Sequence, residues 1–322
     1  MYIYVLYAKF INHDVTAILL YDPDTGAKLH SFEGPTDVEW VAFHPKGGTV
    51  LLVGSAADNT VWMFHIPQKR CLQVFVGHEA AVTAGDFTPD GRWALSTSAD
   101  GSLRVWAPRT GACKHVFRFH NNVGDEPAGL TCMAINGGSD GQLVVVGAED
   151  GQAHVCHIGT KKVVASVRHS EVPRETQAME EDEEEEKGMA ISIEAVGFAP
   201  QNPNWLATGG VDGVVKIWDL ANGAQCRQTF PAMAAGEGIT RLRWHPHLPL
   251  FFTASTLGTI RLWDARNGCL LATQTGSTDV INDLVICYAE EGKKALLTAA
   301  SDDKTVRVFE IDVPAALQAA QS

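Results

Sequence analysis

The sequence predicts an all-β protein built from a four-stranded unit that is repeated along the whole chain. Three observations support this prediction. A tight turn containing Asp or Gly recurs, followed each time by an alternating strand that ends on a large residue six positions later. A second strand pattern, ending in an aromatic residue and a proline, precedes most of these turns. The composition, 45% hydrophobic with 30 glycines in 322 residues, is that of a turn-rich globular protein.

The strand after each turn sets the length of the repeat. Alternation with a period of two indicates a strand with two different faces, as in Asp100-Gly101-Ser-Leu-Arg-Val-Trp106. The large residues that end these strands are Phe64, Trp106, Cys156, Trp218, Trp263 and Phe309. Their spacing is 42 to 50 residues, except for 62 between Cys156 and Trp218. A period of roughly 40–45 residues with a Trp-Asp signature is typical of a β-propeller blade of four antiparallel strands.

The first strand of each unit has its own end signal. Segments such as Val38 to Pro45 and Ile239 to Pro246 end at a proline, which has no amide to donate to a neighbouring strand. The sequence therefore predicts one propeller domain over 1–322. Its six complete blades are predicted at 37–75, 78–118, 128–168, 190–230, 237–273 and 280–312, after a partial first blade at 2–32.

Both ends of the repeat region look incomplete. Residues 2–32 contain no recognisable inner strand, and Val313–Ser322 offers no convincing outer strand. Propellers avoid exposed sheet edges by closing the ring, often with a strand from the opposite terminus. We therefore expect either further N-terminal sequence, giving an intact protein of seven or eight blades, or recruitment of Tyr2–Tyr7 as a closing strand.

The long spacing contains an acidic run, Glu180–Glu186. We predict that residues 169–189 form a disordered acidic insertion, since such runs are usually solvated loops; a contact with a basic or histone-like partner is the alternative. The run accounts for about half of the net charge of −13. An acidic protein repels phosphates and anionic lipids and attracts basic partners. We therefore expect no direct contact with nucleic acid or membrane.

The repeated units resemble the WD-repeat family over nearly the whole chain. In that family a histidine, a hydroxyl residue, an aspartate and a tryptophan form a hydrogen-bond network, which is matched in the second unit by His78, Ser96, Asp100 and Trp106. The match is incomplete elsewhere, because Leu257 replaces the turn aspartate and Cys156 replaces a tryptophan. We expect the blades to differ in local stability.

Three stretches, Phe32–Pro45, Asp86–Trp106 and the acidic run followed by Ser192–Phe198, give a finer resemblance. In order and spacing they are similar to the family of the angio-associated migratory cell protein and its fungal counterpart. The fungal protein is a dedicated ribosome-assembly chaperone of universal large-subunit ribosomal protein sixteen, called L-ten in yeast. The resemblance implies eight blades and an acidic face that captures the basic N-terminal segment of the newly made ribosomal protein until delivery to the pre-60S particle.

Apart from this resemblance, the positions of acidic residues in loops and turns predict a binding face. Propeller ligands usually contact the face formed by the loops that lead into the inner strands and the turns before the third strands. The candidate partner-binding residues at those positions are Asp37, Glu39, Glu149, Glu194, Glu237, Asp279, Asp283, Asp302 and Asp303. Converging carboxylates would focus a negative field and speed the capture of a Lys/Arg-rich segment. The alternative is the ordinary scatter of acidic residues on a soluble surface.

The sequence gives no sign of an enzyme, a cofactor or a metal site. It contains no Ser-His-Asp order, P-loop or glycine-rich phosphate cradle. His44 and the pair His245 and His247 lack a third ligand at a fixed spacing, so we interpret them as strand-end residues. The seven cysteines form no CxxC pair, which favours reduced, buried thiols in a cytoplasmic protein, with the nucleus as a second compartment.

Two further functions stay open. Trp263-Asp-Ala-Arg266 matches the box by which some WD-repeat proteins dock as substrate receptors on cullin-RING ubiquitin ligases. The same arginine also arises simply from the turn after a third strand. The remaining alternative is a generic scaffold within a multiprotein complex.

Overall fold

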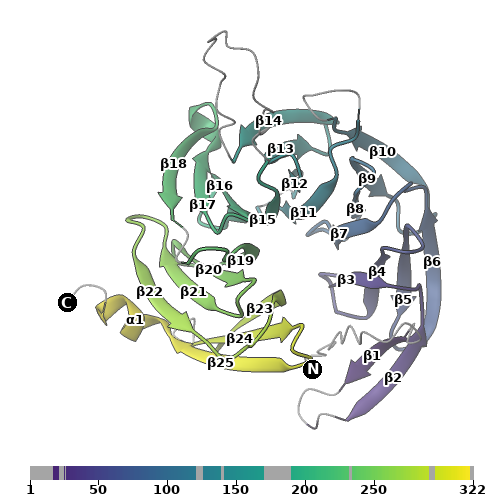
Figure 1. Cartoon of the computed structure of the whole chain (residues 1–322). Helices are drawn as coiled ribbons and strands as arrows, with labels where there is room; N and C mark the ends of the chain where they lie inside the picture. Colours follow the sequence, from purple (N-terminus) through teal and green to yellow (C-terminus); the bar gives the residue numbers. More distant parts are fainter. Residues whose placement is uncertain are drawn as a thin grey trace, which may run out of the picture.

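The computed structural model describes residues 17–21, 25, 27–120, 126–138, 141–169, 190–231, 234–289 and 294–319. Six consecutive antiparallel sheets are arranged around a centre, each forming one blade (Figure 1). A pair of strands, β1 (Ala17–Tyr21) and β2 (Lys28–Glu33), precedes them. The predicted all-β propeller of repeated blades is confirmed.

The first five blades have four strands each, and the chain runs from the innermost strand to the outermost one. The first blade consists of β3 (Val38–Phe43), β4 (Val50–Ser55), β5 (Thr60–His65) and β6 (Arg70–Val76). The second consists of β7 (Val82–Phe87), β8 (Ala94–Ser98), β9 (Ser102–Trp106) and β10 (Cys113–Arg118), and the third of β11 (Leu130–Ile135), β12 (Leu143–Ala148), β13 (Gln152–His157) and β14 (Lys162–Arg168). The fourth consists of β15 (Ile193–Ala199), β16 (Asn202–Gly210), β17 (Val215–Asp219) and β18 (Gln225–Phe230), with the short 3-10 helix η1 (Leu220–Asn222) before β18. The fifth consists of β19 (Ile239–Trp244), β20 (Leu250–Ser255), β21 (Ile260–Asp264) and β22 (Leu270–Gln274).

The sixth blade differs from the prediction of a complete unit over 280–312. In the described part of the chain it has three strands, β23 (Ile281–Ala289), β24 (Lys294–Ser301) and β25 (Val306–Asp312). The helix α1 (Val313–Ala319) follows instead of a fourth strand and packs against β22. Its alanine-rich sequence favours a helix, and Asp312 caps it by accepting the Ala315 amide at 2.9 Å.

The core lies between neighbouring blades rather than within one sheet. The ring of Phe75 on β6 contacts that of Trp106 on β9, with 5.6 Å between centroids. In the same way Phe230 on β18 packs against Trp263 on β21 at 5.7 Å. These rings are buried, so each blade depends on the next one to cover its apolar face.

Strands β1 and β2 extend the ring beside the first blade (Figure 1). Ile18, Leu20 and Phe32 are buried in a cluster with Leu51 and Phe64 of that blade. The inner strands contact one another in the order β3, β7, β11, β15, β19 and β23. Residues 2–7 lie outside the described residues, so the closing strand stays a prediction.

One residue of the predicted insertion 169–189, His169, belongs to the folded ring. His169, which we had included in it, is 1% exposed and its ring hydrogen-bonds the Thr208 hydroxyl at 2.7 Å. Residues 170–189, with the acidic run, lie outside the described residues. No helix among the described residues is both long and apolar enough to cross a membrane.

The thiols are free, but not all of them are buried. Cys132 and Cys156 lie in the core, where burial raises the pKa of each to about 12. Cys113, Cys226 and Cys269 are exposed, so the prediction of buried thiols is wrong for these three. They lie at or just before outer strands, which no further strand covers.

Candidate functional site

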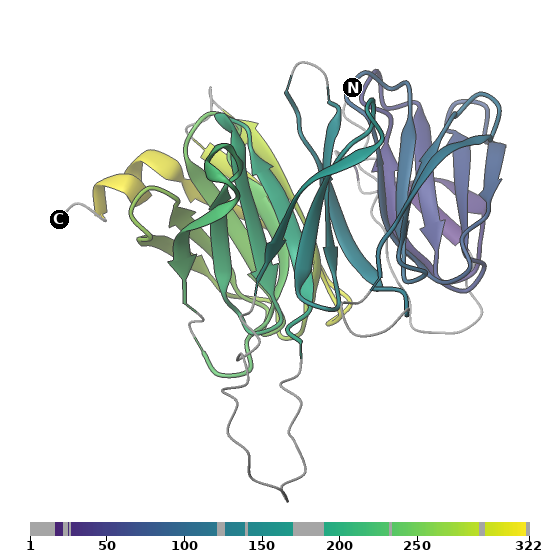
Figure 2. The ribbon, with the colours of Figure 1, turned by 90° about the horizontal axis from the view of Figure 1, so that it is seen from above.

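One face of the ring, here called the loop face, collects every candidate binding residue at or near one end of the strands. Because consecutive strands alternate in direction, the connections between blades and the turns between second and third strands lie at the same end of the blades. Figure 2 shows the strands from the side, running between two opposite faces. The described connections are 34–37, 77–81, 119–120, 126–129, 169, 190–192, 231, 234–238 and 275–280. The described turns are 56–59, 99–101, 149–151, 211–214, 256–259 and 302–305.

Charge is strongly segregated between this face and the opposite one. Over those loop-face residues there are twelve carboxylates and one lysine, Lys304, with no arginine. The carboxylates are Asp37, Asp58, Glu79, Asp100, Glu126, Glu149, Asp150, Asp212, Glu237, Asp279, Asp302 and Asp303. The described connections of the opposite face carry one carboxylate, Asp90, and six basic residues, Lys46, Lys69, Arg92, Arg109, Lys161 and Arg266. Among the described connections and turns, the negative charge is therefore concentrated on the loop face.

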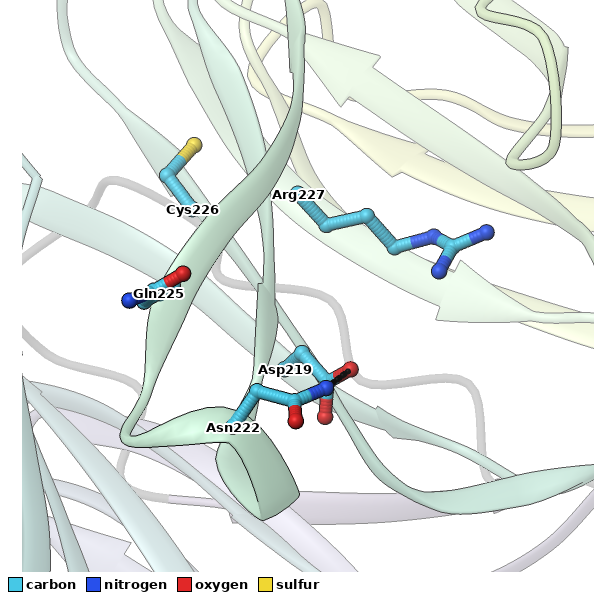
Figure 3. A pocket seen from close by; sticks show the side chains of 5 residues that line it. All are labelled: Asp219, Asn222, Gln225, Cys226 and Arg227. Carbon is cyan, nitrogen blue, oxygen red and sulfur yellow. Dashed lines mark hydrogen bonds between the residues drawn. The ribbon is translucent and has the colours of Figure 1, made fainter.

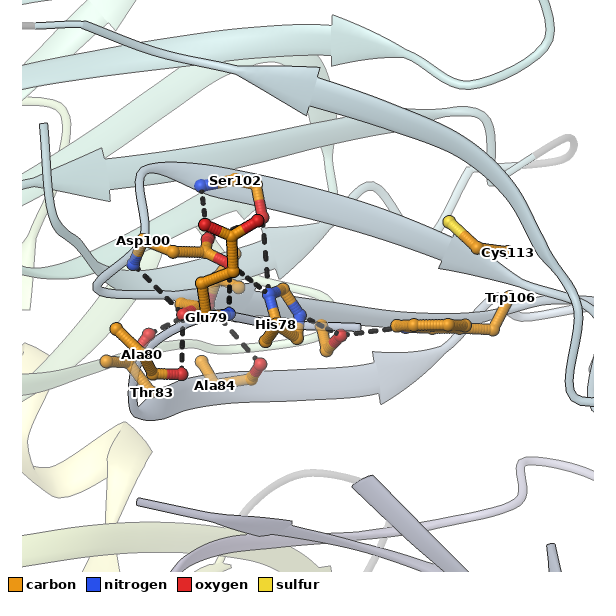
Figure 4. A network of polar contacts seen from close by, with 12 residues as sticks. His78, Glu79, Ala80, Thr83, Ala84, Asp100, Ser102, Trp106 and Cys113 are labelled. Carbon is orange, nitrogen blue, oxygen red and sulfur yellow. Dashed lines mark hydrogen bonds and ion pairs between the residues drawn. The ribbon is translucent and has the colours of Figure 1, made fainter. Parts of the chain in front are cut away.

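Some of these carboxylates stabilise the fold. In the second blade His78 bridges Asp100 at 3.0 Å and Ser96 at 2.7 Å, and the Trp106 indole donates to the Ser96 hydroxyl at 2.8 Å (Figure 4). This is the network that the sequence predicted. Burial alone would raise the pKa of Asp100, but hydrogen bonds from His78 and Ser102 outweigh it and hold that pKa well below its usual range.

A second network of the same residue types, which we did not predict, lies in the fourth blade. His169 Nδ1 pairs with the Thr208 hydroxyl at 2.7 Å, and the Trp218 indole donates to the same oxygen at 2.9 Å. The other ring nitrogen of His169 lies 3.5 Å from Asp212. The histidine precedes its hydroxyl partner by 39 residues here but by 18 in the second blade, because the acidic insertion lies between them. A histidine directly before the insertion was the signal that could have revealed it.

Glu237 is buried, and its assignment as a partner-binding residue is wrong. Its side chain is 2% exposed and receives two hydrogen bonds from Arg261, at 2.6 and 2.9 Å, and one from the Thr259 hydroxyl at 2.5 Å. Burial favours the neutral acid, but these bonds outweigh it and lower the pKa of Glu237. The carboxylate thus contacts the hydroxyl two residues after the turn position 257, as His78 contacts that of Ser102 two residues after Asp100.

Asp303 is also a structural residue rather than a binding residue. It accepts the amides of Thr278 and Thr305 and pairs with Arg307 at 2.5 Å. Its side chain is only 8% exposed. Hydrogen bonds from Thr305 and Thr278 hold the pKa of Asp303 well below its usual range.

Asp283 is exposed but already neutralised. It lies 3.3 Å from Arg243 and 3.7 Å from Arg241, two arginines of the neighbouring inner strand β19. Its carboxylate is therefore less available to a basic partner than the sequence suggested. Asp302 accepts a hydrogen bond from the Asn282 side chain.

The remaining candidates lie on several blades. Asp37, Glu149 and Asp279 are exposed, whereas Glu39 is half-buried on β3. Glu194, also half-buried, accepts the Ser192 hydroxyl at 2.6 Å. Three further exposed carboxylates, Asp58, Glu79 and Glu126, were not among our candidates although they stand in the same turns and loops. The exposed negative charge therefore extends over the first, second, third and sixth blades.

The arginine of the possible ligase box is engaged within its own turn. Arg266 donates to both carboxylate oxygens of Asp264, at 2.9 Å from Nε and 2.6 Å from Nη2, although its side chain is 57% exposed. The turn lies on the opposite face. The contact with Asp264 within this turn is sufficient to explain the conformation of the Arg266 side chain.

The opposite face also holds the strand-end histidines. The Nδ1 atoms of His44 and His245 accept backbone amides of the residues that follow, at 3.2 Å from Lys46 and 3.1 Å from His247. They thus fix the turns after the inner strands, as interpreted from the sequence. No group of three potential metal ligands was found among the residues that the structure describes.

A surface pocket of about 510 Å³ lies on the fourth blade (Figure 3). It is lined by Asp219, Asn222, Gln225, Cys226 and Arg227, all around the hairpin between β17 and β18. Asp219 accepts the Ala221 amide and the Asn222 side chain, so it is used to build the hairpin. The lining residues include no histidine that could act as a base for the thiol.

These observations agree with comparisons to known proteins. The family model "WD domain, G-beta repeat" matches residues 26–65, 69–107, 192–219 and 224–264. The chain belongs to the WD-repeat family. This WD-repeat protein is 33% identical to human angio-associated migratory cell protein over 94% of the chain. It is 28% identical to an uncharacterised WD repeat-containing protein of Schizosaccharomyces pombe over 77% of the chain. The chain spans 64% of the length of the human relative and 56% of that of the yeast relative.

A solved structure shows the same fold. Chaetomium thermophilum Sqt1, crystallised bound to the N-terminus of the ribosomal protein L10, superposes with a TM-score of 0.71. The match covers 92% of this chain and 79% of the Sqt1 chain, with 21% sequence identity. The expected resemblance to the angio-associated migratory cell protein and its fungal counterpart is confirmed.

Proposed function

We propose that this WD-repeat protein is a non-enzymatic chaperone of ribosome biogenesis. Its loop face captures the basic N-terminal segment of a newly made large-subunit ribosomal protein of the universal sixteen type, L10 in yeast. The observation that carries the proposal is the segregation of charge, with twelve carboxylates and one lysine among the described connections and turns of the loop face. The binding of the L10 N-terminus by Sqt1, which has the same fold, supports the choice of partner.

The binding carboxylates in this proposal are the exposed ones. Asp37, Glu79, Glu126, Glu149 and Asp279 are exposed and lie on the loop face of different blades, whereas Asp100, Glu237 and Asp303 are held by structural partners. A single exposed ion pair contributes only about 0–1 kcal/mol, so affinity requires several pairs formed together. A basic segment of extended shape, crossing several blades, satisfies this condition.

Charge reversal tests the proposal. The double variant Glu149→Lys/Asp279→Lys removes two exposed carboxylates from different blades and adds two positive charges. We expect it to bind a peptide of the ribosomal protein's N-terminal segment at least tenfold more weakly at low salt. Binding by the wild-type protein should weaken as salt is added, because screening is stronger at higher ionic strength.

The matched control reverses a carboxylate away from this face. Glu310 lies on β25, is 55% exposed and pairs with Lys294 at 2.7 Å, so Glu310→Lys makes one of the two Glu/Asp-to-Lys changes away from the loop face and should be compared with Glu149→Lys alone. The control should bind the peptide like the wild type. Equal binding by the double variant and the wild type would refute the assignment of the loop face.

The cellular setting follows from the same proposal. A chaperone of a newly made ribosomal protein acts in the cytoplasm, where the client is synthesised, and in the nucleus if it accompanies the client to the assembling subunit. Imaging a tagged protein would test this location. Recovery of a cullin-ligase adaptor that requires Arg266, in place of a small basic protein, would instead favour the receptor function.

A further inference from the structure

The loop face is not uniformly acidic. At the turns of the fourth and fifth blades stand two exposed apolar residues, Val211 and Leu257, with exposures of 48% and 53%. Val211 occupies the turn position of Glu149 in the third blade, and Leu257 that of Asp100 in the second. Other blades carry an acid at these turn positions. Exposed apolar residues there indicate a surface that binds an apolar group.

The position of Leu257 follows from the altered network of its blade. In the second blade the turn aspartate is drawn inward by His78. The fifth blade has Ala235 at the position of that histidine, and Glu237 forms hydrogen bonds with Arg261 and Thr259 instead. No inward polar partner is needed at position 257, and its side chain stays exposed at the turn.

A glycine keeps the two turns close together. A Cβ added at Gly238 would lie 3.0 Å from the Val211 carbonyl oxygen and 3.4 Å from the Thr256 methyl group. The Thr256 amide donates to the Gly238 carbonyl at 2.9 Å. The turn of the fourth blade and that of the fifth therefore meet at this glycine.

The surroundings of this pair, here called the apolar sector, are small and carry little available charge. Ala234, Ala235 and Gly236 precede Glu237 and are exposed. The two carboxylates of this region, Asp212 and Glu237, are held by His169 and Arg261. Among the described residues, the exposed acids of the loop face lie on other blades.

We propose that the apolar sector formed by Val211 and Leu257 receives a bulky hydrophobic side chain of the same basic segment. This inference rests on the proposed function, because it adds a second contact to the same bound segment. The basic residues of that segment pair with the exposed acids, while the apolar side chain covers the sector and fixes the position of the segment. Burial of apolar surface is not screened by salt, so part of the affinity should persist at high ionic strength.

Val211→Glu distinguishes this contact from simple charge attraction, because the two explanations predict opposite signs. The third blade carries Glu149-Asp150 at the equivalent positions, so Glu beside Asp212 is compatible with this turn. Added negative charge should strengthen the binding of a basic segment if capture is purely electrostatic. If the apolar sector is a contact, the variant should bind the N-terminal peptide of the ribosomal protein about tenfold more weakly, equivalent to about 1.4 kcal/mol.

A neutral variant and a matched control complete the test. Leu257→Asn removes the second apolar side chain without changing charge, and we expect a similar loss that is still present at high salt. Val163→Glu makes the same change as Val211→Glu at a residue that is 46% exposed on the outer strand β14, and it should bind like the wild type. Circular dichroism of each variant confirms folding before binding is measured.

The outcomes separate the two proposals. Tighter binding by Val211→Glu, or unchanged binding by Leu257→Asn, would overturn the apolar contact while leaving the acidic capture intact. If the wild-type protein itself does not bind the basic peptide, the proposed function fails instead.

Discussion

The ion pair between Glu237 and Arg261 allows a quantitative test of the structure. The carboxylate is 2% exposed and the guanidinium 11% exposed, and two hydrogen bonds of 2.6 and 2.9 Å join them. Arg261→Met keeps the aliphatic volume of the side chain but leaves a buried carboxylate with only the hydroxyl groups of Thr259 and Ser255 as partners. Breaking a buried pair by removing one partner typically costs about 3–5 kcal/mol.

The expected loss is measurable by thermal and urea unfolding. At 2–4 °C per kcal/mol, 3–5 kcal/mol corresponds to a fall in Tm of roughly 6–20 °C. The fifth blade could also open before the rest of the ring, in which case hydrogen exchange would show the loss of protection there first. Near-neutral pH is the condition of choice, since a lowered pKa keeps Glu237 charged there.

A double variant shows whether the penalty comes from the unpaired charge. Glu237→Leu/Arg261→Met replaces both charges by apolar groups, and such replacements of buried pairs are often neutral or stabilising. We expect the double variant to recover most of the stability lost by Arg261→Met. An Arg261→Met protein as stable as the wild type, or a double variant worse than the single one, would refute the assignment of Glu237 as a buried structural acid.

Three further predictions concern the fold. Thr208→Val should lower the free energy of unfolding by about 1–3 kcal/mol, because the Trp218 indole loses its acceptor and His169 loses its hydroxyl partner. An unchanged thermal unfolding curve would argue against the network of the fourth blade. Asp100 has a depressed pKa in the folded state, so its contribution is present above the ordinary value of about 4 and is lost as the pH falls below it; Asp100→Asn should flatten the dependence of Tm on pH between about pH 5 and pH 2. Gly85→Ala would place a Cβ 2.1 Å from the Trp40 ring and 2.7 Å from the Leu95 carbonyl oxygen, and should cost about 1–3 kcal/mol or more, whereas Gly137→Ala, with nothing within 4 Å, should be far milder.

The repeat itself could be predicted from the sequence because it depends on local signals. The turn residues, the alternating strand and the proline after the inner strand recur within each unit, and the six blades follow them. The network around His78 was also predictable, since its four members stand at the usual separations. We expected no outer strand in Val313–Ser322 and yet counted 280–312 as a complete blade, whereas the described residues form three strands there, followed by α1.

The identity of the available carboxylates could not be predicted in the same way. The turn position places a residue on the loop face but does not determine whether its side chain points outward. Glu237 and Asp303 are directed inward by arginines on the third strands, Arg261 and Arg307. A basic residue two positions before the large residue that ends the third strand was a signal for this pairing. Arg104 has the same position but forms no ion pair with another described residue, so a basic residue there does not by itself predict the pairing.

The loop face has acidic and apolar parts because the blades differ in the hydrogen-bond partners of their turn residues. Where His78 or His169 is present, the turn aspartate is drawn inward. In the fifth blade, where Ala235 stands at the histidine position, Glu237 pairs with Arg261 and the exposed Leu257 occupies the turn position. The residues that stabilise the blades consequently determine which positions stay exposed for a partner. For this reason the net charge of the chain indicates only the sign of the partner's charge. The exposed residues of each turn indicate where the basic and apolar groups of that partner bind.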